Sequence, residues 1–219
     1  MGLHYSPRII TDGLEQYYSV PDPNSYSGSG GTWYDLVTGS TSPGNPNWAN
    51  NISEITIQLW LEKTGTGTGY ANHPVQKWNN CYCHNASFIL YHFENYQGNG
   101  QDGNLAWLGN STPEQNSGWT GIAGSSIWMV SGEIANVVLQ YNSRTGGQMW
   151  KNGEKVGGKG GTTGMLGQTS IDSATSDIGI YGPSAAGTSR VREIMFYSRE
   201  LSDAEIVQNY NVRKGKYGL

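Results

Sequence analysis

The sequence predicts an all-β fold, an antiparallel β-sandwich with one short C-terminal helix, and three observations support this class. The first is composition: the 219 residues include 32 glycines, 14 tyrosines and 8 tryptophans, whereas only 14% of residues are charged. Glycine adopts the positive-φ conformations of tight turns, and aromatic side chains pack well on pleated sheets. The second observation is a period-two alternation of apolar residues, and the third is an Asn-Gly pair between the two short strands of a predicted hairpin.

The clearest strand is predicted over residues 54–62. Its apolar residues are Ile55, Ile57, Leu59 and Leu61, and the residues between them are Thr56, Gln58 and Trp60. A period of two sends the first set to the core and the second set outward. Further strands are predicted over residues 87–93, 105–108, 127–130, 134–141, 177–181 and 189–197. Many short strands without βαβ alternation favour an antiparallel sandwich or jelly roll.

Two local signals define a hairpin and a helix. Asn152-Gly153 separates residues 148–151 from residues 154–156, and this pair readily takes the two positive-φ positions of a type I′ turn. Ser202 and Glu205 form a capping box, which predicts that a helix begins there. The residues that fall on one arc of this helix, and that we expect to pack against the sandwich, are Ile206, Val207 and Tyr210.

Length and charge limit the organisation of the chain and its partners. We expect one domain over residues 1–219, with residues 1–31 including an N-terminal docking segment and a Pro/Gly/Ser-rich surface loop. The 17 acidic and 13 basic residues form no run of like charges, so neither nucleic acid nor an anionic membrane is an expected partner. No segment has the length of a membrane span, and the N-terminus lacks the pattern of a secretion signal, which favours synthesis in a cytoplasm.

Acidic residues do not form an obvious catalytic pair. Glycoside hydrolysis needs two carboxylates separated by roughly 5 to 10 Å. Glu54 and Glu62 lie at opposite ends of one predicted strand, Glu193 stands alone in another, and Glu133 sits in a Gly-containing turn. We therefore predict no catalytic residues, although carboxylates from separate strands could still meet.

Metal and phosphate sites are also not predicted. Cys81 and Cys83, followed by His84, have the wrong spacing for structural zinc, and a disulfide between positions i and i+2 is strained, so two reduced thiols are expected. The glycines of residues 157–162 do not follow the order of a phosphate-binding loop. The available calcium ligands, Asp172, Asp177 and Asn136, show no diagnostic spacing, so no metal or cofactor is expected.

Tryptophans remain as candidate contacts, because sugar rings stack on exposed aromatic side chains. Trp60 lies on the polar side of its predicted strand, and Trp107, Trp119 and Trp128 flank Gly-rich turns. Most of the eight tryptophans should belong to the core, since large aromatic side chains are highly buried on average. Trp60, Trp107 and Trp119 are the predicted ligand-binding or partner-binding residues.

Several segments together resemble the concanavalin A-like, or laminin-G-like, lectin and glucanase superfamily, in the form found in structural proteins of tailed bacteriophages. The segments that carry the likeness are residues 5–14, 25–36, 55–61, 150–153 and 194–205. The resemblance implies a jelly roll of two curved sheets that recognises carbohydrate or protein. The acidic strand motif of the glucanase members is absent, which removes the main reason to infer hydrolysis.

The phage-type resemblance, with the missing catalytic pair and the single domain, leads us to expect a non-enzymatic virion structural protein, made in the host cytoplasm and located in the virion. The leading interpretation is a capsid decoration or cement protein. Its expected partners are the major capsid protein or other virion proteins and a second copy of the chain in a homo-oligomer, with surface glycans as a further possibility. The alternative is a tail-fibre or tail-associated module that binds host glycans, and a glycoside hydrolase is the less favoured third class.

Overall fold

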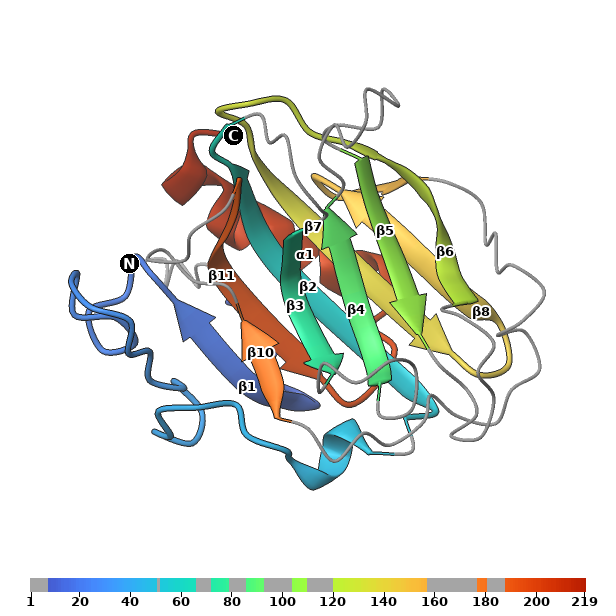
Figure 1. Ribbon diagram of the computed structural model, residues 1–219, viewed down its shortest axis with the longest axis horizontal. Coiled ribbons are helices and arrows are strands. Elements are labelled where there is room, and N and C mark those ends of the chain that lie inside the picture. The colour runs from blue at the N-terminus through green and yellow to red at the C-terminus, as the bar shows by residue number, and fades with distance from the viewer. Residues whose placement is uncertain are drawn as a thin grey trace, which may run out of the picture.

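Two antiparallel sheets lie face to face in the computed structural model, which describes residues 8–50, 52–65, 72–78, 86–92, 104–109, 120–156, 177–180 and 188–219 (Figure 1). Within these residues one sheet has six strands, in the order β1 (Leu14–Ser19), β11 (Ser189–Tyr197), β2 (Glu54–Lys63), β7 (Ile134–Asn142), β8 (Gly146–Lys151) and β9 (Glu154–Val156). The other has five, in the order β10 (Ile178–Ile180), β3 (Asn72–Trp78), β4 (Ala86–His92), β5 (Asn104–Gly109) and β6 (Thr120–Trp128). The predicted all-β sandwich is confirmed.

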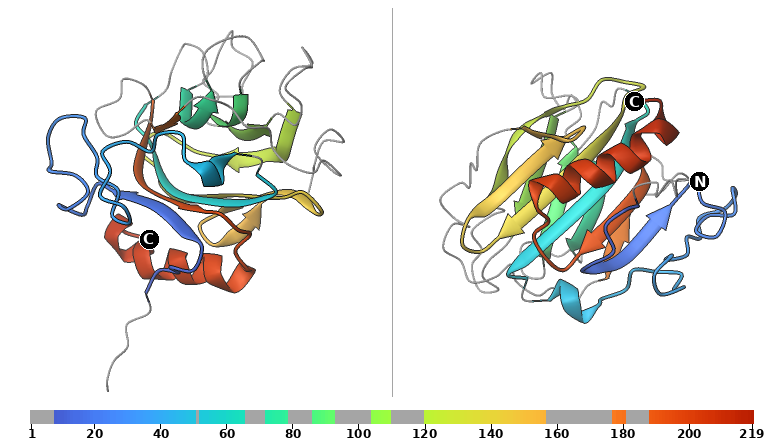
Figure 2. Two further views of the ribbon diagram at one scale, coloured as in Figure 1. Left: turned by 90° about the horizontal axis from the view of Figure 1, so that it is seen from below. Right: turned by 180° about the vertical axis from the view of Figure 1, so that it is seen from behind.

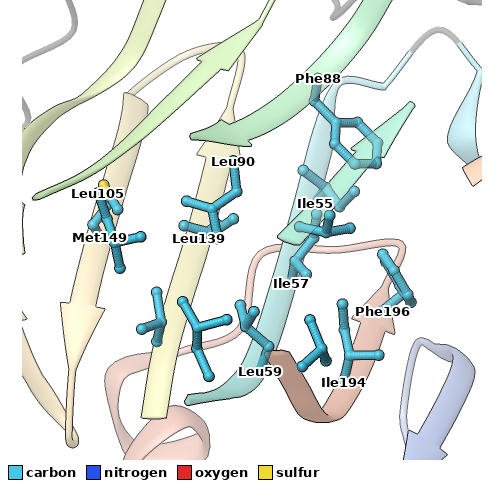
Figure 3. Packing of buried hydrophobic residues seen from close by; sticks show 14 of the residues in the cluster. Ile55, Ile57, Leu59, Phe88, Leu90, Leu105, Leu139, Met149, Ile194 and Phe196 are labelled. Atoms are coloured by element: carbon cyan, nitrogen blue, oxygen red, sulfur yellow. The ribbon is translucent and has the colours of Figure 1, made fainter. Parts of the chain in front are cut away.

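The space between the sheets is filled by apolar side chains from both of them (Figure 3). The six-stranded sheet contributes Ile55, Ile57, Leu59, Leu139 and Phe196, and the five-stranded sheet contributes Val75, Phe88, Leu90 and Leu105, all fully buried. Each such side chain stabilises the fold by about 1.5 to 3 kcal/mol relative to solvent exposure. The inward set predicted for residues 54–62 therefore forms part of the core, as expected.

The outer edge of β1 is closed by the loop that follows it. The Tyr17 N–H donates to Asp35 Oδ1 at 2.8 Å, and the Leu36 N–H donates to the Tyr17 carbonyl at 2.8 Å. The Ser19 N–H donates to Ser25 Oγ at 2.9 Å. Because these bonds use backbone groups that an edge strand would otherwise present, this part of β1 is not a free template for another strand.

A helix, α1 (Asp203–Arg213), and the 3-10 turn η3 (Lys214–Tyr217) lie across the outer face of the six-stranded sheet (Figure 2). The predicted capping box is present, since the Glu205 N–H donates to Ser202 Oγ and the Ser202 N–H donates to Glu205 Oε2. Ile206 is fully buried and Val207 is partly buried, so the predicted arc packs against the sandwich. A shorter 3-10 turn, η1 (Asn47–Ala49), precedes β2. No helix in the described part of the chain is both long and apolar enough to cross a membrane.

The hairpin between β8 and β9 turns at Asn152 and Gly153, as predicted. Their φ angles are 53° and 82°, both positive as a type I′ turn requires. Gly153 has a second constraint, because a Cβ atom there would lie 2.9 Å from Cδ1 of Tyr210 on α1. The turn thus joins the six-stranded sheet to the helix that covers it.

Other predicted boundaries differ from the structure. Strand β6 extends over Thr120–Trp128, whereas the sequence predicted a strand only over residues 127–130. Strands β1 and β3 were not predicted. The ends of two predicted strands, at Phe93 and Tyr181, lie outside the described residues, as do residues 1–7 of the predicted N-terminal docking segment.

Replacement of Gly153 by alanine tests the contact between the hairpin and α1. Gly153→Ala should destabilise the fold by about 2 to 4 kcal/mol, because it combines a strained positive φ with overlap against the Tyr210 ring. The matched control is Gly28→Ala, whose φ is +89° but whose Cβ meets nothing within 4 Å, so it reports backbone strain alone. Urea unfolding would measure both, and equal losses in the two variants would contradict the steric contact.

Acid titration tests the start of α1. Hydrogen bonds from Arg199 are the main cause that lowers the pKa of Glu205 from its usual value to about 2. A lowered folded-state pKa adds stability above the unfolded value, near pH 4.5, and that stability is lost as the pH falls towards 2. Glu205→Gln should therefore cost about 1 kcal/mol near neutral pH, since the pair is partly exposed, and progressively less below pH 4.5. Urea unfolding at several pH values measures this, and a loss independent of pH would contradict it.

Candidate binding surfaces

Trp60 is not a surface contact, and the prediction that it binds a ligand or partner is wrong. The sequence placed Trp60 outward together with Thr56 and Gln58, yet all three side chains are fully buried. The reason is that α1 and η3 cover this face of the six-stranded sheet. The Trp60 ring stacks against Tyr217, with ring centroids 4.3 Å apart, and against Tyr210 at 5.9 Å.

Polar side chains beneath the helix are joined by hydrogen bonds. The Gln58 side chain donates to Asn136 Oδ1 at 3.0 Å and accepts from Asn209 Nδ2 at 3.0 Å. Asn209 also accepts at Oδ1 from the Ile10 N–H, which ties the N-terminal segment to α1. Buried polar groups are costly unless they are bonded, so this network favours one position of the helix on the sheet. Asn136, a calcium-ligand candidate in the sequence, is part of this network instead.

Glu193, which the sequence left without a second carboxylate on its strand, is bound by an arginine and two tyrosines in the structure. Its carboxylate is fully buried and accepts hydrogen bonds from Arg213 Nε at 2.6 Å and Nη2 at 2.8 Å. The hydroxyls of Tyr17 and Tyr217 donate to it at 2.7 and 2.8 Å. Burial, and then the nearby carboxylate, raise the pKa of both tyrosines well above the usual value, so both phenols stay protonated. This cluster fastens α1 and η3 to the sheet and presents no carboxylate to solvent.

One pair of neighbouring carboxylates was not found in the sequence, because its members come from different elements. Glu54 begins β2 and Glu200 lies just before α1, and the Asn142 amide nitrogen donates to both, at 3.3 and 2.8 Å. The Glu200 N–H also approaches Glu54 Oε2 at 3.4 Å. One amide bound to two carboxylates offsets part of their mutual repulsion. It also links β2, β7 and the segment before the helix.

The clearest exposed aromatic side chain is Trp128, at the end of β6. Trp128 is 49% exposed and Val130 is 70% exposed, whereas Ile127 and Met129 are buried in the core. This alternation continues beyond the last residue of β6 and points Trp128 and Val130 to the same side. The same alternation is visible in the sequence, where residues 127–130 were predicted as a strand, so exposure could have been inferred there.

Fixed polar contacts hold this part of the chain. Lys151 Nζ lies 2.6 Å from Glu133 Oε1 and donates to the Trp128 carbonyl at 2.6 Å. The Val130 N–H donates to Glu133 Oε2 at 2.9 Å. We call Trp128, Val130, Glu133 and Lys151 the Trp128 surface. Because the backbone is tied at both ends of the turn, the backbone that carries the indole ring has little conformational freedom left to lose on binding.

The Trp128 surface combines an apolar ring with charged groups beside it. An exposed indole can stack on a sugar ring or fill a pocket in a protein partner, and tryptophan is enriched among the residues that dominate interfaces. The Lys151 and Glu133 side chains are each about one fifth exposed, so they can offer a donor and an acceptor at the rim. Binding is therefore the chemistry that this arrangement supports.

The remaining sequence candidates are only partly placed. Trp107 lies in β5, where its backbone is opposite Leu90 on β4 and Ala123 on β6, and its side chain is not described. Trp119 lies outside the described residues. So do the cysteines and histidine of residues 81–84, the glycines of residues 157–162 and Asp172. In the described ranges, no group of three or more His, Cys, Asp or Glu side chains could hold a metal ion.

No protein-family model and no curated protein matches the sequence. Solved structures do match the fold. Trypanosoma rangeli sialidase in complex with the inhibitor DANA gives a TM-score of 0.58 at 18% identity, over 92% of this chain and 33% of that chain. A mutant of that sialidase displaying trans-sialidase activity gives 0.60 at 16% identity, over 94% and 34%. A structure of botulinum neurotoxin type C, whose cell entry depends upon interaction with two ganglioside molecules, gives 0.51 at 11% identity, over 75% and 36%.

This chain thus spans about one third of the length of these proteins. At such low identity the similarity shows the fold alone. It supports the sandwich of two antiparallel sheets that the sequence resemblance implied. The phage origin that the resemblance also implied stays a prediction.

Removal of the buried carboxylate tests the cluster under the helix. Glu193→Gln should destabilise the fold by about 3 to 5 kcal/mol, because Arg213 would remain buried without its counter-ion. The matched control is Glu62→Gln on β2, which loses a partly exposed pair with Arg192 and should cost about 1 kcal/mol or less. Urea unfolding followed by tryptophan fluorescence gives both values. Similar losses in the two variants would show that Glu193 does not fasten the helix.

Proposed function

We propose that this chain is a non-enzymatic attachment domain that binds its partner through the Trp128 surface. The observation that carries the proposal is a half-exposed indole on a turn whose backbone is bonded by the Lys151–Glu133 pair. The burial of Glu193 beneath α1 adds support, because that carboxylate cannot reach a substrate in this arrangement.

In our proposal this domain works at the surface of a virion. The phage-type resemblance of the sequence motivates this part. The chain would decorate or cement a capsid, with the major capsid protein or another virion protein as its partner. A tryptophan and a valine side by side suit a contact of this kind, since aromatic anchors surrounded by polar groups dominate protein interfaces.

Substitution of Trp128 tests the attachment role. Trp128→Ala should weaken binding to particles that lack the protein by about tenfold to a hundredfold, the loss typical of an aromatic anchor. Its stability should stay close to that of the unchanged chain, because the ring is half exposed. Co-sedimentation with the particles measures binding, and thermal unfolding measures stability.

The control for that experiment is Asn211→Ala, an exposed position on α1 away from the Trp128 surface. This variant should bind as the unchanged chain does. Particles that lack the protein should also break at lower temperature, and adding the unchanged chain should restore them. Binding by Trp128→Ala equal to the control would contradict attachment through this surface.

A second candidate function is recognition of host glycans by a tail fibre or tail-associated protein. The specific observation in its favour is again Trp128, because an exposed indole can stack on a sugar ring, and the partly exposed Lys151 and Glu133 side chains bond to the adjoining backbone. The similarity to the neurotoxin that interacts with gangliosides is compatible with this candidate. Glycan-array binding by the isolated chain, lost in Trp128→Ala, would favour it over the decoration role.

A glycoside hydrolase is the least favoured class, and the structure provides a direct check. Glu54 and Glu200 are the carboxylates that approach one another through Asn142. Polysaccharide turnover by the chain, abolished in Glu54→Gln or Glu200→Gln, would contradict the non-enzymatic proposal.

A further inference from the structure

A long surface segment of this chain carries no exposed formal charge. Between Pro23 and Ser53 the sequence contains one ionised side chain, Asp35, and that carboxylate is buried. The chain as a whole has a formal net charge of −4, and its other charged residues lie outside this segment. Depletion of charge is characteristic of the centre of protein interfaces, whereas ordinary surfaces carry Lys, Glu and Asp.

Three buried residues, Ser25, Trp33 and Asp35, fix the segment to the sandwich. Trp33 packs between Tyr18 of β1 and Tyr26, with ring centroids 6.2 and 6.1 Å apart. Ser25 Oγ donates to the Tyr34 carbonyl at 2.6 Å, and the Tyr34 N–H donates to the Ser25 carbonyl at 2.7 Å. The backbone of Tyr34 is thus held from both sides, next to the edge of β1.

Asp35 holds the next part of the segment. Its Oδ1 atom accepts from the backbone N–H groups of Tyr17 and Val37 at 2.8 and 3.0 Å. Its Oδ2 atom accepts from the Thr38 N–H at 3.2 Å. The carboxylate therefore acts within the protein and adds no charge to the surface. The backbone of Val37 is fixed by the same group.

Between and beside these buried anchors, apolar side chains point to solvent. Tyr34 is 44% exposed and Val37 is 48% exposed, and residues 27–32 and 38–42 around them are exposed Ser, Thr and Gly. Tyrosine, serine, glycine and asparagine are the residues that antibody loops use for contact, because tyrosine gives area at low entropic cost and the others adapt their hydrogen bonds. We call residues 23–48 the neutral surface.

We propose that the neutral surface of one chain pairs with the neutral surface of a second copy across a twofold axis. In such a pairing residue i of one copy contacts residue j of the other, and j contacts i, so a charge close to the axis meets the same charge. A surface without exposed charge avoids this repulsion, even though the whole chain is acidic. Of the 26 residues from position 23 to 48, 23 are not buried, which lies within the roughly 20 to 30 residues a side of a standard interface.

The neutral surface and the Trp128 surface share no residue. The first lies beside β1 and the second follows β6, and these strands belong to different sheets. Pairing through the first would therefore leave the second available to bind, with two copies of it in each dimer. This inference is independent of the proposed function, because either surface can fail without the other.

Charge introduced at Val37 tests the pairing. Sedimentation equilibrium of the full chain at micromolar concentration should show a dimer whose dissociation constant changes little with salt. Val37→Lys and Val37→Glu should each weaken the dimer at least tenfold, because each places like charges across the twofold axis. An equimolar mixture of the two variants should form a heterodimer, since opposite charges then face one another. Tyr34→Ala should also weaken the dimer, through loss of contact area.

Trp128→Ala is the matched control, because it alters another exposed aromatic side chain and should leave the dimer unchanged. Circular dichroism and thermal unfolding should show that the Val37 and Tyr34 variants remain folded. A monomeric unchanged chain would overturn the proposal, as would dimers unaffected by either charge. If the unchanged chain is a monomer and its Tyr34→Ala variant loses particle binding, the proposal is also overturned, since the neutral surface would then contact the virion instead of a second copy.

Discussion

The fold of this protein depends on one sheet that is covered on both of its faces. The five-stranded sheet covers the inner face of the six-stranded sheet, and α1 with η3 covers the outer face (Figure 2). Strand β2 shows the consequence, because its inward and outward side chains are buried alike. The Glu193–Arg213 pair and the Gln58 network hold the helix there. Residues that bind a partner on this side of the sandwich must therefore lie in the rims and loops, because the helix covers the sheet.

Much of this fold could be predicted from local patterns. The segments over residues 54–62, 134–141 and 189–197 were predicted within one residue of β2, β7 and β11, since alternation, β-branched residues and turn signals agree there. The Asn-Gly turn and the capping box followed from the chemistry of two residues each. Strand β1 was missed because its buried residues include Gln16 and Ser19 as well as tyrosines, so no apolar alternation is visible. Strand β3 contains Pro74 and Lys77, which argue against a strand in sequence.

The candidate sites were harder to predict, and the reason is long-range contact. Alternation correctly separated the two faces of β2 but could not show that Tyr210 and Tyr217, far along the chain, would cover Trp60. The ion pair of Glu193 was not predicted for the same reason, since Arg213 reaches it from the helix. Trp128 was noticed beside a turn, yet its support by Lys151 and Glu133 needs the spatial neighbours. The face of a strand on which a residue lies is thus predictable from the sequence, whereas the residues that contact it from distant parts of the chain are not.

Amide hydrogen exchange, measured on the free chain and on the chain bound to the virion particle that we propose as its partner, tests the central claim most directly. If α1 and η3 close the outer face, amides of residues 54–63 and 206–213 should be strongly protected in the free chain and unchanged on binding. New protection should appear instead over residues 127–133, around the Trp128 surface. Rapid exchange in the helix of the free chain, or binding that alters β2 and the helix while residues 127–133 stay unchanged, would contradict the account.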